Sequence, residues 1–170
     1  MRKATNEEIQ ALLFRTPFED GTLELFFAGL EDPFMVEAKR GIASSSEKSH
    51  PTSAIIVKDG KILSTGSNQT GYKNPLMRFL HAKFPESFCR RKILKVPSGQ
   101  GYHLCRGCAK PEDHAEARAG AKLLGTHGRV EGSTLYLYGH WWCCEPCCQA
   151  MVSAGVRKVV LLEGASRMFK

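Results

Sequence analysis

Two short motifs, about thirty residues apart, constrain this chain more than any other feature of its sequence. The first is His114-Ala115-Glu116, and the second is Cys144-Glu145-Pro146-Cys147. Zinc binds neutral imidazole nitrogen and cysteine sulfur readily, and a catalytic zinc site uses three protein ligands and leaves the fourth position to water. The motifs therefore predict a hydrolytic zinc site with the ligands His114, Cys144 and Cys147, which any fold of the chain must bring together.

Glu116 is the candidate catalytic residue of this site. A bound zinc ion lowers the pKa of water from about 15.7 to roughly 7, and a neighbouring carboxylate can carry the proton that the water gives up. Both motifs come at the start of a predicted helix, at residues 114–124 and 146–154. The N-terminus of a helix favours thiolate over thiol. Two such helices, packed side by side on a sheet, would bring the ligands together.

A second group of cysteines precedes the first motif. Cys105-Arg106-Gly107-Cys108 forms a separate Cys-x-x-Cys pair, and Cys89 lies in the same long segment. Clustered pairs of this kind are typical of metal ligands in a reducing compartment, and a long segment without a core of its own is costly to order. We expect a structural zinc ion held by Cys89, Cys105, Cys108 and either His103 or His81. The alternative is that these cysteines are ordinary reduced thiols.

The positive charge of the chain is concentrated in one segment. The chain has a net charge of +7, and residues 69–110 contain a single acid, Glu86, beside nine basic residues: Lys73, Arg78, Lys83, Arg90, Arg91, Lys92, Lys95, Arg106 and Lys110. One interpretation is a solvated basic loop. The other is a surface that faces the phosphate of a nucleotide or a nucleic acid.

The order of the predicted elements indicates an α/β fold. A capping box at Thr5 and Glu8 opens a helix that extends to about Phe14, a second helix is expected at residues 19–30, and Asp32-Pro33 starts a third. A hairpin follows, with strands at 53–57 and 61–66 around Asp59-Gly60. A helix at 75–84 lies within the basic segment, and strands at 133–138 and 158–162 alternate with the two motif helices. This alternation predicts parallel pairing after the hairpin.

Several segments resemble the cytidine deaminase superfamily, and the resemblance is greatest to its deoxycytidylate deaminase-like branch. The similarity covers roughly residues 32–162. It rests on His114-Ala115-Glu116, on the cysteine pair, on the hairpin and turn at 57–68, and on the helix end and strand at 154–160. It implies a three-layer α/β/α fold with a mixed sheet of four to five strands and helices on both faces. It also implies an N-terminal helical extension at residues 1–31 and a deaminase domain at 32–170 with a long basic, Cys-containing loop at about 69–110.

The resemblance also implies residues that contact the substrate. Asn68 matches the position of an Asn that contacts the sugar or phosphate, and Trp141 resembles a Trp that precedes the cysteine pair in polynucleotide cytidine deaminases. Trp142 and Ala115 complete the expected substrate-binding set. The two tryptophans could equally serve as core packing of one face. His140 is a further candidate for the lining of the pocket.

The chain departs from the family pattern in three places. Cys143 stands where the family has a Pro before its first ligand, so four clustered thiols compete for two positions; Cys144 with Cys147 keeps both the spacing and the family distance to Gly155. The turn after the hairpin lacks the fuller motif that some relatives use in regulation. The chain also stops soon after the strand at 158–162, where a fifth strand and its helix would follow.

The expected activity is zinc-dependent hydrolytic deamination of a cytosine-containing nucleotide of the dCMP or CMP type, which gives the uracil product and ammonia. One alternative is a deaminase acting on cytosine in single-stranded DNA or RNA, with the basic segment along the backbone. Another is a non-catalytic, zinc-stapled nucleic-acid-binding module. The resemblance implies a homo-oligomer. The longest apolar stretch has six residues and no signal peptide is evident, so we expect a cytoplasmic protein that does not enter a membrane.

Overall fold

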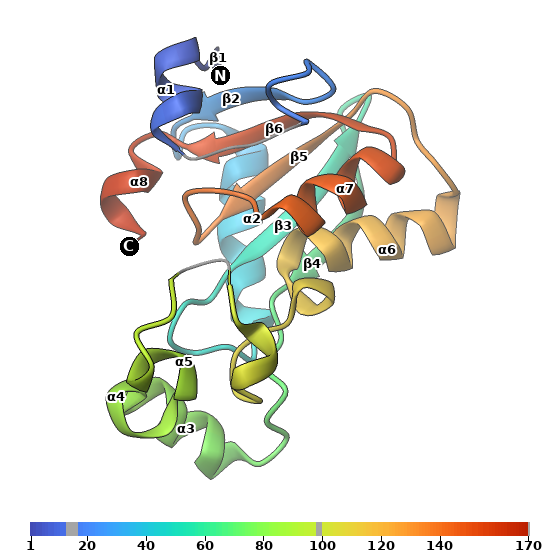
Figure 1. Ribbon diagram of the computed structural model, residues 1–170. Helices are drawn as coiled ribbons and strands as arrows, with labels where there is room; N and C mark the ends of the chain where they lie inside the picture. Colours follow the sequence, from blue (N-terminus) through green and yellow to red (C-terminus); the bar gives the residue numbers. More distant parts are fainter. Residues whose placement is uncertain (13–16, 98–99, 170) are drawn as a thin grey trace.

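The structure is a computed structural model that describes residues 1–12, 17–97 and 100–169. In this part of the chain, the centre is a six-stranded mixed sheet with the order β1-β2-β6-β5-β3-β4 (Figure 1). Its strands are β1 (Arg2–Lys3), β2 (Glu24–Ala28), β3 (Ser53–Lys58), β4 (Lys61–Ser67), β5 (Ser133–Tyr138) and β6 (Val156–Leu162).

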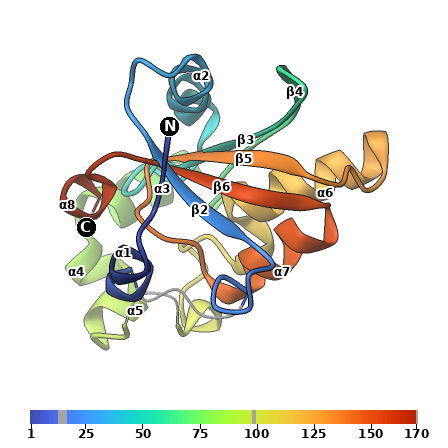
Figure 2. The same ribbon diagram turned by 90° about the horizontal axis from the view of Figure 1, so that it is seen from above.

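Three long helices cover the two faces of the sheet. Helix α2 (Pro33–Gly41) lies on one face, and α6 (Ala115–His127) and α7 (Glu145–Ser153) lie side by side on the other (Figure 2). Alternate residues of the strands serve the two resulting cores. In β5, Leu135 and Leu137 pack with α6 and α7, whereas Tyr136 packs with α2. The three-layer α/β/α fold is therefore confirmed, with six strands in the described residues instead of four to five.

The hairpin and the pairing after it agree with the sequence. Asp59 and Gly60 have positive φ angles of 49° and 74°, as the tight turn between β3 and β4 requires. Strands β5 and β6 pair in parallel, as expected. Ser53, at the start of β3, pairs with both Ser67 at the end of β4 and Tyr138 at the end of β5. The segments that follow β4 and β5 therefore start at the same end of the sheet.

The helix expected at residues 19–30 is wrong. Residues Glu24–Ala28 form β2, which pairs in parallel with β6 and aligns Leu25 with Val159. The place beside β6 is thus occupied by β2, a strand from the N-terminal region. The other local signals near the N-terminus are confirmed. Helix α1 (Asn6–Ala11) begins with a capping box at Thr5 and Glu8, and the end expected near Phe14 lies outside the described residues.

The basic segment contains more regular structure than expected. It folds into α3 (Pro75–Lys83), α4 (Pro85–Phe88), α5 (Arg90–Ile93) and the short helix η2 (Tyr102–Leu104), and η3 (Pro111–Asp113) leads from it into α6. Figure 1 shows α3, α4 and α5 together at one end of the sheet. The remaining short helices are η1 (Ile42–Ser44) and α8 (Ala165–Met168). Among the helices of the described ranges, none combines the length and apolar character needed to cross a membrane.

Candidate active site

The first ligand motif and the cysteine pair meet at the tips of α6 and α7. His114 is the N-cap residue of α6, Cys144 is the N-cap residue of α7, and Cys147 lies in the first turn of α7. The Nδ1 atom of His114 lies 3.4 Å from the sulfur of Cys144 and 3.4 Å from that of Cys147. The two sulfur atoms lie 3.2 Å apart.

These three donors fit a zinc ion in number, type and spacing. Zinc lies about 2.3 Å from sulfur and about 2.0–2.1 Å from nitrogen, so tetrahedral ligand atoms are separated by roughly 3.5–3.8 Å. The measured separations are slightly shorter, and a bound ion would move the donors apart by a few tenths of an ångström. A set of one imidazole and two thiols leaves the fourth tetrahedral position free. Of the four neighbouring cysteines, the group contains Cys144 and Cys147 but neither Cys143 nor Cys148.

The packing of α6 against β4 and α7 places these donors. A Cβ atom on Gly66 of β4 would lie 2.3 Å from the carbonyl oxygen of Ala115 and 2.5 Å from the amide nitrogen of Ala119. Only glycine lets the strand approach the helix so closely. On the other side of α6, a Cβ atom on Gly120 would lie 3.4 Å from the carbonyl oxygen of Ala150 in α7. The close approach of β4 therefore holds the first turn of α6, and α7 packs beside α6 at ordinary contact distance.

Glu116 is buried beside the ligands. It lies in the first turn of α6 and is 4% exposed. Burial raises the pKa of its carboxyl group above the usual range, and the neighbouring His114 opposes this shift. Cys143 lies within hydrogen-bonding reach of the carboxyl group, and burial raises the pKa of its thiol well above the ordinary value. Cys143 is thus a neutral neighbour of Glu116.

The local environment favours ionisation of one of the paired cysteines. Hydrogen bonding with Cys147 and His114 lowers the pKa of Cys144 to about 5, against the effect of burial. The pKa of Cys147 is shifted in the opposite direction through the same pair contact. The thiolate of Cys144 is therefore available to bind a cation, and a bound divalent ion favours loss of the proton of Cys147 as well.

Sequence reasoning missed a contact above His114. The ring of Tyr102 in η2 meets the His114 ring edge-on at 5.0 Å between centroids, and the guanidinium group of Arg91 lies 4.4 Å from the centroid of Tyr102. Burial raises the pKa of Tyr102, which keeps its phenol neutral. Arg91 was identified only as one of nine basic residues, and no local pattern distinguishes Tyr102.

The aromatic residues between β5 and α7 pack on one another. Trp141 and Trp142 lie 5.7 Å apart between centroids, and His140 stacks on Trp141 at 6.2 Å. His140 also hydrogen-bonds through Nδ1 to the carbonyl oxygen of Trp142, and burial lowers the pKa of His140 to about 4. The Nε1 atom of Trp142 is buried and has no hydrogen-bond partner within the described residues. Both tryptophans pack against the core, so core packing accounts for part of each ring.

The two remaining substrate-binding candidates are largely occupied by the fold itself. Asn68 is 8% exposed, and its Oδ1 atom accepts hydrogen bonds from Ser45 Oγ at 2.6 Å and from the amide of Thr52 at 2.9 Å. Its Nδ2 atom donates to the carbonyl oxygen of His50 at 2.8 Å. Ala115 is fully buried at the start of α6. Asn68 thus holds the loop before β3, and one amide hydrogen remains for other partners.

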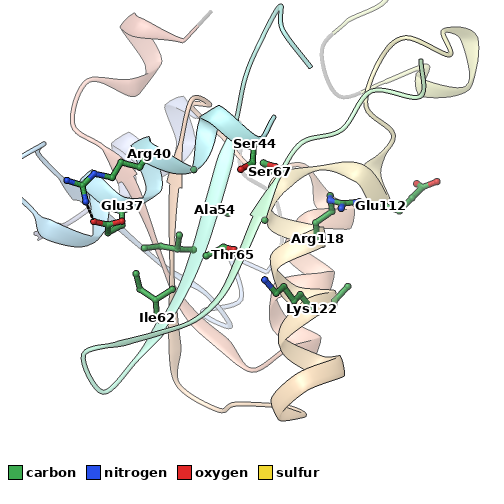
Figure 3. Close-up of a pocket in the computed structure, with 14 residues that line it drawn as sticks. Glu37, Arg40, Ser44, Ala54, Ile62, Thr65, Ser67, Glu112, Arg118 and Lys122 are labelled. Atoms are coloured by element: carbon green, nitrogen blue, oxygen red, sulfur yellow. Dashed lines mark hydrogen bonds and ion pairs between the residues drawn. The ribbon is translucent and has the colours of Figure 1, made fainter. Parts of the chain in front are cut away.

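A cavity of about 800 Å³ lies elsewhere, along β4 between α2 and α6. Figure 3 shows Arg40 and Glu37 of α2 paired on one side, with Arg118 and Lys122 of α6 on the other. Its lining does not contain Glu116 or any of the three ligand candidates. The cavity is therefore separate from the candidate active site.

The second cysteine group also converges, outside the active site. The ligand atoms of His81, Cys89, Cys105 and Cys108 all lie within 4.8 Å of one another. Of the two histidines considered for this group, the structure brings in His81. His103 is exposed and is not part of the cluster.

A three-layer α/β/α domain with an imidazole, two thiols and a buried carboxylate at two adjacent helix tips has the arrangement of zinc-dependent nucleobase deaminases. The family model described as the cytidine and deoxycytidylate deaminase zinc-binding region matches residues 30–163. The chain therefore belongs to the cytidine and deoxycytidylate deaminase family.

Several solved structures are similar to this chain. A dCMP deaminase from the cyanophage S-TIM5, solved with dCMP and dUMP, is 25% identical and has a TM-score of 0.49; the match covers 79% of this chain and 82% of that one. Guanine deaminase from Bacillus subtilis is 18% identical, with coverage of 79% and 66% and a TM-score of 0.43. RibD from Acinetobacter baumannii is 22% identical, with coverage of 75% and 26% and a TM-score of 0.37. No curated protein sequence matches the chain.

Proposed function

We propose that this protein deaminates a cytosine-containing nucleotide of the dCMP or CMP type by zinc-dependent hydrolysis. The observation that carries the proposal is the buried Glu116 at the tip of the helix that also presents His114 to Cys144 and Cys147. The catalytic ligands are His114, Cys144 and Cys147, and Glu116 is the residue that moves protons. Membership of the cytidine and deoxycytidylate deaminase family supports the cytosine base.

The chemistry divides between the metal and the chain. When bound, zinc supplies the Lewis acidity that makes water acidic enough to attack near neutral pH. Glu116 accepts one proton from the water and delivers it to the ring nitrogen, and it then carries the second proton, from the new hydroxyl group at C4, to the departing amine. Water and cytosine are consumed, and uracil and ammonia are released. Because Glu116 is excluded from solvent, it exchanges protons with the reacting groups more readily than with bulk water.

Other residues hold the substrate. Trp141 and Trp142, between β5 and the cysteine pair, form an apolar wall for the pyrimidine ring, and the Nε1 atom of Trp142 is a buried donor for a polar group of the substrate. The basic residues of segment 69–110 bind the phosphate. This segment leaves β4 at the same end of the sheet at which β5 ends. Asn68 supports the loop beside the substrate and offers one remaining amide hydrogen.

We propose that the enzyme works in the cytoplasm. Seven free cysteines, five of which are ligands in one of the two clusters, suit a reducing compartment such as the cytoplasm. We further propose a homo-oligomer, and residues 32–170 as the deaminase domain with residues 1–31 as its N-terminal extension.

The test is an ammonia-release assay over cytosine, cytidine, CMP, dCMP, dCTP, oligonucleotides, adenosine and guanine. A phosphate held by charged hydrogen bonds, each of about 1.5–3 kcal/mol, should raise kcat/KM for CMP or dCMP about 10–100-fold above that for cytidine. Preference for oligonucleotides, with a steep loss of affinity in salt, would instead favour the polynucleotide activity. Release from adenosine or guanine alone would contradict the proposed base.

The Glu116→Gln variant tests the mechanism. Removal of the proton carrier should lower kcat by about 10²–10⁴-fold, while zinc content stays as in the wild type, because Glu116 is not a ligand. Glu112→Gln is the matched control, since it makes the same change at an exposed residue of η3 and should retain full activity. Wild-type turnover in Glu116→Gln would remove Glu116 from the mechanism.

A further inference from the structure

The structure carries a second cluster of metal-ligating side chains that deamination does not use. We propose that His81, Cys89, Cys105 and Cys108 bind a structural zinc ion, and that this ion fixes Arg91 and Tyr102 above the catalytic ligand His114. The first part is independent of the proposed function. The second part rests on the proposed function, because His114 is a catalytic ligand only if the protein is a zinc-dependent deaminase.

The geometry of the four donors is that of a closed tetrahedral site. The sulfur atoms of Cys89 and Cys108 lie 3.5 Å apart, and His81 Nε2 lies 3.3 Å from Cys105 Sγ and 3.9 Å from Cys108 Sγ. Ligands of a tetrahedral zinc ion are roughly 3.5–3.8 Å apart. Three thiols and one imidazole complete the coordination, so no position remains for water, as is typical of structural zinc sites.

The backbone around the cluster is shaped for it. A Cβ atom on Gly107 would lie 2.5 Å from Cδ2 and 2.7 Å from Nε2 of His81, so glycine alone lets the Cys-x-x-Cys turn meet the imidazole.

The segment has few other means of holding its shape. His81 is 4% exposed, and Cys89 and Cys105 are also buried. In contrast, many of the large apolar side chains of the segment are exposed: Leu76, Phe79, Phe84, Phe88, Ile93 and Leu94. The ligand cluster is thus the buried centre of a segment that hides little apolar surface. Binding of an ion at such a centre supplies folding free energy directly.

A short chain of contacts joins this cluster to the active site. Cys89 is the residue directly before α5, which carries Arg91, and Cys105 directly follows η2, which carries Tyr102. The guanidinium group of Arg91 lies over the ring of Tyr102. Tyr102 in turn contacts His114. Loss of the ion should therefore release Arg91 and Tyr102 together.

Metal content of the full-length protein tests the site. We expect two zinc ions per chain in the wild type, one in His114→Ala and one in Cys105→Ser. The matched control is His103→Ala, which removes the exposed histidine of the same segment and should leave two ions. One ion in the wild type and none in His114→Ala would overturn the proposal, whatever the activity of the enzyme.

A second measurement covers the case in which Cys105→Ser does not fold. In His114→Ala the remaining zinc should be coordinated by three sulfur atoms and one nitrogen, which X-ray absorption spectroscopy at the zinc edge measures. A remaining ion with two sulfur ligands would be one still bound by Cys144 and Cys147 in the altered catalytic site, and it would contradict the proposal.

Hydrogen exchange tests the link to the active site without an activity readout. If Cys105→Ser folds, its amides in α5 and η2 should exchange faster than in the wild type, while β5 and β6 keep their protection. His103→Ala should leave both regions unchanged. Unchanged exchange around Arg91 and Tyr102 in Cys105→Ser would show that the ion does not hold them.

Discussion

At the scale of single residues, the sequence identifies the reactive groups and misses the residues that surround them. A His-x-Glu motif and a Cys-x-x-Cys pair are readable because metal ligands need fixed atom types at short spacing. Four clustered cysteines leave the pair ambiguous; the spacing and the distance to Gly155 favour Cys144 and Cys147, and the structure groups the same two with His114. Tyr102 was not foreseen, because its contact with His114 depends on how the basic segment folds back on α6.

Asn68 illustrates a residue whose part in the fold is visible only in three dimensions. It accepts hydrogen bonds from Ser45 and Thr52 and donates one to His50. Asn68→Ala leaves the buried amide of Thr52 without its partner, which costs about 1–3 kcal/mol, whereas Ser45 Oγ and the carbonyl oxygen of His50 keep other hydrogen bonds. We expect the free energy of unfolding, measured by urea denaturation, to fall by at least about 1 kcal/mol.

The control for this substitution is Asn6→Ala in α1, where the side chain is exposed and the change should stay within about 0.5 kcal/mol. An Asn68→Ala protein with unchanged stability and a raised KM would mean that the side chain serves the substrate alone.

At the scale of elements, local signals predicted those structures that local interactions determine. The N-cap at Asp32 and the capping box at Thr5 act within one helical turn, and both helices begin where expected. The turn at Asp59-Gly60 is equally local. Strand β2 was wrongly predicted as a helix. It forms a strand because it pairs with β6, and β6 is far from residues 24–28 in the sequence, so local signals do not reveal the pairing.

The contact between β4 and α6 gives a prediction at this scale. Gly66→Ala places a methyl group against the backbone of Ala115 and Ala119, so the helix must move. Overpacking of this kind costs about 1–3 kcal/mol, and a displacement of about 1 Å at His114 and Glu116 can lower activity up to about 10²-fold. Thermal denaturation and kcat/KM measure the two effects.

Gly125→Ala is the matched control, since a Cβ atom at Gly125 of α6 meets no atom within 4 Å. Alanine is a better helix former than glycine by about 1 kcal/mol, so this variant should be as stable as the wild type or slightly more stable, with full activity. Equal behaviour of the two variants would show that the close approach of β4 to α6 does not position the site.

At the scale of the whole molecule, the alternation of strands and helices predicted three layers, and the structure confirms them. The strand count was too low because the sheet takes β1 and β2 from the N-terminal region, outside the part of the sequence that resembles the family. The sheet of this chain is thus continuous across the expected boundary at residue 32. The boundary itself stays a prediction.

Truncation tests this boundary. Removal of residues 1–31 takes away β2 and leaves the edge of β6, with its apolar Val159, Val160 and Leu161, without a neighbour. An exposed apolar edge strand promotes aggregation, so we expect residues 32–170 to aggregate in size-exclusion chromatography. Removal of residues 1–12 keeps β2 and should give a less stable but soluble protein. A soluble, zinc-loaded 32–170 fragment would contradict this expectation.

The parallel pairing of β2 with β6 has a consequence for biosynthesis. Translation produces β2 before β6, with roughly 130 residues between them, which ribosomes add at about 5–20 residues per second. The nascent polypeptide therefore displays the apolar face of β2, including Leu25 and Phe27, for on the order of ten seconds before its partner emerges. The yield of mature protein in a cell should consequently depend on chaperones that shield this segment during elongation.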